Sequence, residues 1–328
     1  METGNLQSLV ILPDSVAPSF CYYNSNDAQH EIMSAEKLQK AVDFCEENDL
    51  SATVVYGDRL TDEHYRILND FPHVRIISAS KIHTFPFSET DVAVMEYGVD
   101  SFENFDEKRK YHVILQMNLN DVVHLPMLVF QRHALFSRLN VTVKDIAGAN
   151  EDALNRFRLD LQPLKDVIFR LFRENRFFEL NIATDRMVLD TVKSCDAGIK
   201  HLTLAPDGRF YLCPAFYYDS KKQAVGSLGE VINIPNRHLL RIEYAALCRL
   251  CDCYQCRRCT YLNKKLTGEL NTPSRQQCVL SHHERNLSGM LLQKLQSKGF
   301  LANAKTILPL YYLDPLEYYR EIVNLSFG

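Results

Sequence analysis

The chain carries its densest run of cysteines between residues 248 and 259, where it reads Cys248-Arg-Leu-Cys251-Asp-Cys253-Tyr-Gln-Cys256-Arg-Arg-Cys259. Five of the ten cysteines fall within these twelve residues, and three more lie at 195, 213 and 278. Thiolates at C-x2-C spacing can turn inward on one tight turn and hold a single metal ion or cluster. We therefore predict a metal-binding region whose candidate ligands are Cys195, Cys213, Cys248, Cys251, Cys253, Cys256, Cys259 and Cys278.

The bulk composition is that of an ordinary globular protein. Hydrophobic residues make up 46% of the 328 residues and charged residues 24%, with a net charge of -4 and a pI of about 6.3. This balance offers no global basic field for a nucleic acid. The sequence has no apolar run of membrane-spanning length and no signal-peptide pattern, so we expect a cytoplasmic protein without a membrane partner. In a reducing cytosol, clustered cysteines indicate metal or redox chemistry rather than disulfides.

The first 190 residues alternate between predicted strands and helices. Apolar, β-rich runs predict strands at 8–12, 52–56, 74–78, 91–96, 111–116, 139–143 and 179–183. Ser34 is a candidate helix cap, and the residues after it show helical periodicity. Cys45 lies on the apolar face of this predicted helix, and we expect it to be a small core residue. Further helices are expected at 62–69, 122–138 and 151–175, and we expect Pro163 to start a new helix within the last of these. Such alternation favours an α/β fold with a mainly parallel sheet.

The pattern changes near residue 195. Two short extended runs joined by Pro206-Asp207-Gly208 predict a hairpin over 201–213. A helix is expected from 234 to 247 and another from 281 to 299, with a loop at 271–275 between them. The aromatic tail that includes Tyr311, Tyr312, Tyr318 and Tyr319 is expected to pack on the body.

The cysteine spacing C-x12-G-x4-C, then C-x2-C-x4-C-x2-C, then a final Cys278, resembles the SPASM/twitch extension of radical SAM peptide-modifying enzymes. This resemblance implies two auxiliary [4Fe–4S] clusters. One would be bound by Cys248, Cys251, Cys256 and Cys278, and the other by Cys195, Cys213 and Cys259. Either His201 or Cys253 would complete the second set. Between residues 248 and 259 the cysteine spacing departs from the family's usual spacing. Which of these cysteines would share a cluster therefore stays open.

Structural zinc is the alternative for the same thiols, because eight cysteines can also make two four-thiolate zinc sites. Zinc requires only tetrahedral thiolates, whereas a cluster needs a larger pocket. His282 and His283 follow Cys278 closely and could replace a thiolate, but we expect two adjacent exposed histidines.

The loop after the first strand lacks the ligands of a catalytic cluster. Radical SAM enzymes carry C-x3-C-x2-C there, and the matching positions in this chain are Asp14, Pro18 and Cys21. Gly57-Asp58, after the second strand, resembles a decayed form of the segment that meets SAM in that family, although a loop glycine and a helix cap explain it as well. We therefore expect neither SAM binding nor conventional SAM cleavage. Cys21 is either a buried inert thiol or, at the rim of a barrel, a reactive one.

The whole chain most resembles the CXXX repeat peptide maturases, radical SAM-like SPASM proteins of Bacteroidales peptide-modification systems. The matching segments are Leu9-Val-Ile-Leu, Ser19-Phe-Cys-Tyr and the stretch from Pro235-Asn-Arg-His-Leu through Arg285-Asn286. The resemblance implies a degenerate, partial (β/α) barrel at 1–190, a cysteine-rich SPASM-like domain at 191–285 and a helical tail at 286–328.

The function implied is maturation of a ribosomally made peptide bearing cysteines, either alone or with a partner modification enzyme. Whether this protein is itself an enzyme stays open. The alternative is a non-catalytic protein that recognises the peptide or scaffolds a maturase, with metal serving stability.

Overall fold

The computed structural model describes residues 6–25, 30–84, 86–192, 194–302, 304–308, 310, 313–314 and 316. The chain divides into two compact units. The first comprises Met1–Phe105 with Asp196–Tyr244, and the second comprises Asp106–Cys195 with Ala245–Gly328. Each unit therefore combines an earlier and a later part of the chain.

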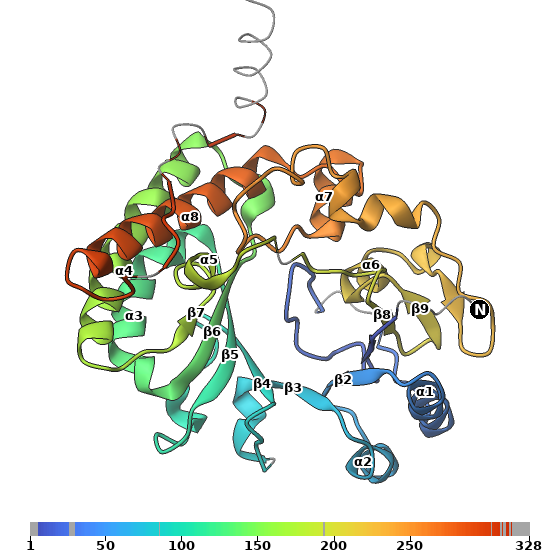
Figure 1. The fold of residues 1–328 in the computed structure, drawn as a ribbon. Helices are drawn as coiled ribbons and strands as arrows, with labels where there is room; N and C mark the ends of the chain where they lie inside the picture. Colours follow the sequence, from blue (N-terminus) through green and yellow to red (C-terminus); the bar gives the residue numbers. More distant parts are fainter. Residues whose placement is uncertain are drawn as a thin grey trace, which may run out of the picture. The chain divides into compact units, whose positions relative to one another are not determined.

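The first unit is built on a mostly parallel sheet. Strands β1 (Ser8–Ile11), β2 (Ser51–Val55), β3 (Val74–Ser78) and β4 (Val92–Glu96) run parallel in that order. On the other side of β1 lies β8 (His201–Leu204), also parallel, followed by the antiparallel strands β9 (Arg209–Tyr211) and β10 (Gly226–Ser227). Helices α1 (Ala35–Glu47) and α2 (Asp62–Asn69) pack side by side (Figure 1). The unit also contains α6 (Pro214–Asp219) and 3-10 turns at Ala79–Thr84, Phe102–Asn104, Lys221–Gln223, Arg237–Leu240 and Ile242–Tyr244.

The second unit contains three parallel strands: β5 (Tyr111–Met117), β6 (Phe136–Val143) and β7 (Glu179–Leu180). Its long helix α4 (Glu151–Arg173) packs against both α3 (Leu125–Arg132) and α8 (Arg275–Gln296) (Figure 1). Shorter helices are α5 (Asp185–Val188) and α7 (Thr260–Thr267), and 3-10 turns lie at Leu119–His124, His133–Leu135 and Ile146–Gly148. Within the part of the chain that the structure describes, no helix is both long and apolar enough to cross a membrane.

The predicted fold class is confirmed: the protein is mixed α/β with a parallel sheet. The expected strands all form, although β7 is only two residues long. Ser34 caps α1 as predicted, its side chain accepting a hydrogen bond from the Lys37 backbone N–H, and Cys45 is buried in the core. The hairpin turn is also confirmed, with Gly208 at a φ of +83°, a conformation that glycine adopts at little cost.

Three helical predictions are wrong in extent. The expected helix 122–138 is reduced to α3, because β6 already begins at residue 136. Pro163 lies inside the continuous helix α4. Its neighbours Leu161 and Leu164 are buried, and this packing offsets a proline cost of about 3 kcal/mol. The expected helix 234–247 is replaced by two 3-10 turns. The aromatic tail residues Tyr311, Tyr312, Tyr318 and Tyr319 lie outside the described residues.

Candidate metal centre

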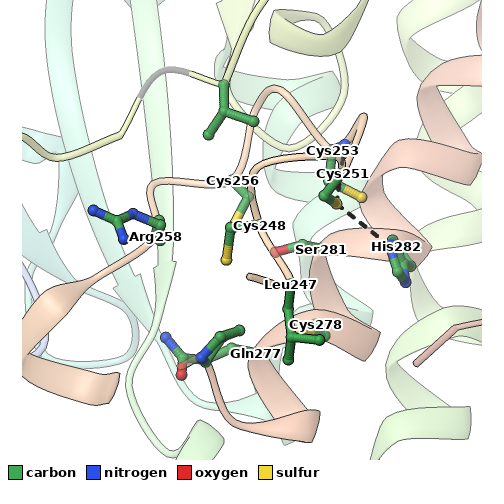
Figure 2. A pocket seen from close by; sticks show the side chains of 12 residues that line it. Leu247, Cys248, Cys251, Cys253, Cys256, Arg258, Gln277, Cys278, Ser281 and His282 are labelled. Carbon is green, nitrogen blue, oxygen red and sulfur yellow. Dashed lines mark hydrogen bonds between the residues drawn. The ribbon is translucent and has the colours of Figure 1, made fainter. Parts of the chain in front are cut away.

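A small cavity, partly open to solvent, lies in the second unit between the cysteine-rich loop and helix α8. Figure 2 shows the loop facing the helix, with Cys248 directed into the space between them. Five of the predicted ligands line this cavity together with one histidine: Cys248, Cys251, Cys253, Cys256, Cys278 and His282. The structure thus gathers five thiols that the sequence spreads over 31 residues.

Helix α8 positions two of the lining residues. It starts earlier than predicted, at Arg275, because Ser274 and Gln277 form a capping box. Cys278 therefore lies in the helix rather than after a loop. His282 follows four residues later and shares the helix face of Cys278, since residues four apart are neighbours on an α-helix. The expectation of two exposed histidines is wrong: His282 is 1% exposed and His283 4%.

An arginine on α8 holds the cysteine-rich loop. The Arg285 side chain, 1% exposed, donates from Nε to Asp252 Oδ1 at 2.6 Å and also pairs with Asp252 Oδ2. Arg186 of α5 adds a bond to the same carboxylate at 3.2 Å and lies over the Tyr254 ring at 4.3 Å. Because Asp252 stands between Cys251 and Cys253, these contacts set where both thiols point. Sequence reasoning missed this ion pair, and the only signal for it was the aspartate inside the cysteine run.

His282 has both ring nitrogens engaged. Nδ1 donates to the carbonyl oxygen of Leu313 at 2.5 Å, which leaves the Nε2 lone pair facing Cys251 Sγ at 3.8 Å (Figure 2). An imidazole oriented in this way by a backbone carbonyl is typical of a metal ligand. The sequence identified His282 as a possible substitute for a thiolate, but only the structure shows its burial and orientation.

Burial and hydrogen bonding separate the pKa values of the thiols. Burial raises the pKa of Cys248 to about 12 and that of Cys278 far above the usual range. By contrast, hydrogen bonding from Cys253, including its backbone N–H at 3.5 Å from Cys251 Sγ, lowers the pKa of Cys251 to about 5 despite burial. Burial would also raise the pKa of Asp252, but Arg285 and Arg186 hold it below its ordinary value. Since metals bind thiolates, loading this cavity with metal must release protons from most of its thiols.

The remaining predicted ligands lie elsewhere. In the second unit, Cys195 donates its backbone N–H to Arg257 O at 2.8 Å and interacts electrostatically with Cys259, whose pKa is raised to about 12, mainly by burial. Cys213, buried at the N-terminus of α6, and the half-buried His201 at the start of β8 belong to the first unit. Which of the eight thiols bind metal stays a prediction.

The loop after β1 does not fit a three-thiolate cluster. At the first ligand position stands Asp14, fully buried and paired with the Arg59 guanidinium. Its carboxylate also accepts backbone N–H bonds from Val16 at 2.9 Å and from Arg59 at 3.0 Å. Gly57 leaves room for the Asp14 side chain, because a Cβ at position 57 would collide with it.

An ion pair and its supporting glycine therefore fill the place at which the family pattern puts cluster ligands. Asp58 is not a helix cap: it pairs with Lys81, and the N-cap of α2 is Thr61.

Comparison with protein-family models finds no match, and no curated protein matches in sequence. Solved structures do match. The anaerobic sulfatase-maturating enzyme anSMEcpe with bound AdoMet superposes with a TM-score of 0.60 at 13% identity, over 89% of this chain and 96% of that one. The same enzyme bound to AdoMet and a Cp18Cys peptide gives a TM-score of 0.58, also at 13% identity, over 89% and 99%. The fold of this chain is therefore of the radical SAM/SPASM type.

Proposed function

We propose that this protein is a component of a ribosomal peptide maturation system of the CXXX repeat type, which binds a cysteine-containing precursor peptide and auxiliary [4Fe–4S] clusters in the cytoplasm. The observation that supports this proposal best is the gathering of five thiols around one cavity in a chain with this fold. The neighbour with this fold was crystallised with a cysteine-containing peptide, which supports a peptide as the substrate class.

The cavity supports one cluster, bound by Cys248, Cys251, Cys256 and Cys278. A [4Fe–4S] cluster takes four thiolates, and four of the cysteines that line the cavity can provide them. Arg258, 4% exposed, also lines the cavity, and its charge offsets the negative charge of the thiolates. Cys195, Cys213 and Cys259 are proposed for the second cluster, completed by Cys253 or His201.

Conventional radical SAM cleavage is not part of the proposal. The Asp14–Arg59 pair stands where that reaction needs a thiolate-bound cluster, so the protein acts on its peptide without reductive SAM cleavage or presents it to a partner modification enzyme.

A second candidate is a non-catalytic peptide-recognition or maturase-scaffolding protein with zinc in place of clusters. The close approach of His282 to Cys251 favours it, because imidazole and thiolate together suit zinc.

Metal and sulfide analysis of protein purified without oxygen tests the proposal. Two clusters require about eight irons and eight sulfides per chain, with a brown charge-transfer band. Changing Cys195, Cys213 and Cys259 to alanine should remove one cluster and spare the other. Colourless protein with about two zinc ions refutes the cluster role and supports the scaffold.

Binding of the precursor peptide is measured separately. A fluorescently labelled peptide with its cysteines intact is compared with the same peptide carrying serines. If neither peptide binds at concentrations up to the solubility limit, the protein is neither a peptide maturation component nor a peptide-recognition scaffold.

A further inference from the structure

Three side chains in the second unit offer ligand atoms close enough to share one ion. The sulfurs of Cys251 and Cys253 and a ring nitrogen of His282 all lie within 4.8 Å of one another. Cys253 and His282 are each 1% exposed, so the group is largely shielded from water.

The separation of these atoms favours a single ion. With bonds of about 2.3 Å to sulfur and about 2.0 Å to nitrogen, a tetrahedral ion holds its ligand atoms about 3.5–3.8 Å apart. Cys251 Sγ and His282 Nε2 are 3.8 Å apart. In a [4Fe–4S] cluster each protein ligand binds a different iron, which requires wider spacing.

Two contacts outside the group hold it in this arrangement. The Leu313 carbonyl accepts the Nδ1 proton of His282 and thereby keeps Nε2 unprotonated and turned toward Cys251. The Arg285–Asp252 pair holds the turn that carries both cysteines. Outer contacts of this kind fix ligand orientation in natural metal sites.

We propose that Cys251, Cys253 and His282 form a mononuclear site for a zinc-class divalent cation, with a fourth coordination position open to an exogenous thiolate. Three protein ligands with an open fourth position are the usual arrangement of a zinc site that binds a further ligand. All three side chains line the cavity, which is partly open to solvent, so an exogenous ligand can reach an ion held between them. A thiolate suits an ion that is already bound by two thiolates. This site uses Cys251, a ligand of the first proposed cluster, and Cys253, a possible ligand of the second, so the two metal assignments exclude one another at these residues.

Cobalt(II) titration of protein stripped of metal under anaerobic conditions tests the proposal. Cobalt(II) reports tetrahedral thiolate ligation by its visible and near-ultraviolet absorption, independently of any activity. We expect one equivalent to bind with thiolate charge-transfer bands. His282→Ala should weaken this binding at least tenfold, and His282→Cys should restore it with a more intense charge-transfer band.

His283→Ala is the matched control, because it removes the adjacent buried histidine and should leave cobalt binding within twofold. Cys278→Ser separates the two assignments: a mononuclear Cys251–Cys253–His282 site keeps its cobalt bands, whereas a four-thiolate site loses them. Addition of 2-mercaptoethanol should intensify the charge-transfer band by supplying the fourth ligand. An unchanged cobalt affinity in His282→Ala, loss of the bands in Cys278→Ser, or no response to 2-mercaptoethanol would each overturn the proposal as stated. Because the two assignments share Cys251, iron and sulfide of about eight each per chain would refute this site and leave the proposed function standing. Cobalt binding as expected, with less iron, would refute the cluster assignment alone.

Discussion

Replacing Arg285 by methionine should loosen the cysteine-rich loop. Methionine keeps much of the side-chain volume but removes the donors to Asp252 and to the Leu308 carbonyl, which lies 2.7 Å from Nη1. Removing one partner of a buried ion pair costs about 3–5 kcal/mol. The Asp252 side chain is 33% exposed, so water can solvate its carboxylate and compensate part of this loss. We therefore expect the free energy of unfolding to fall by about 3 kcal/mol.

Thermal unfolding measures this cost. For a unit of this size, 1 kcal/mol shifts the midpoint by about 2–4 °C, so Arg285→Met should lower it by about 6–12 °C. Metal affinity should fall about 10- to 100-fold, as for other residues that orient metal ligands from outside. Both effects have the same cause, the lost anchor between Cys251 and Cys253.

Lys294→Met is the matched control on the same helix. Lys294 pairs with Asp166 at 2.6 Å, but the two side chains are 36% and 61% exposed. An exposed pair contributes at most about 1 kcal/mol, so this variant should unfold within about 4 °C of the parent and bind metal equally well. If Arg285→Met behaves like Lys294→Met in both measurements, the anchoring role of Arg285 is wrong.

Three further predictions concern Asp14, Gly57 and Cys251. Asp14→Asn should lower the free energy of unfolding by about 3 kcal/mol. This is the lower end of the range for breaking a buried ion pair, because the Arg59 side chain is 34% exposed. Burial raises the pKa of Asp14, but hydrogen bonds and the charge of Arg59 outweigh this and lower the pKa below its ordinary value. The ion pair therefore stabilises the fold fully above the ordinary carboxyl pKa, and this stabilisation is lost as the pH falls through the lowered pKa of the folded protein. The urea midpoints of parent and variant should therefore converge in acid, and a constant gap contradicts this reasoning. Gly57→Ala should cost about 1–3 kcal/mol, because its Cβ meets Asp14, and an unchanged urea midpoint would show that the loop adapts freely. In metal-free protein, Cys251, with a pKa of about 5, should be alkylated by iodoacetamide before Cys248 at pH 7, and mass spectrometry of the modified peptides would expose the opposite order.

Local sequence determined most of the secondary structure. Apolar runs located β1 to β5 nearly to the residue and Ser34 marked the start of α1, since a strand or a capped helix depends on its immediate neighbours. The strand β6 begins at Phe136, earlier than its apolar run indicated. The spacing of the cysteines also indicated a metal region, because ligands that share one turn are close in sequence. The resemblance carried by that spacing implied the fold type that the solved structures bear out.

Tertiary structure decided where the remaining elements end and what the site contains. Pro163 continues α4 because buried neighbours outweigh its local cost, which no helix rule anticipates. Helix α8 begins six residues earlier than its periodicity suggested. The helix face that carries His282 lies toward the cysteine-rich loop, so His282 is buried. Arg285 and Asp252 meet across 33 residues of chain. Contacts of this kind arise only when distant segments pack together, so the thiol spacing predicted a metal region while the fold determined which side chains surround it.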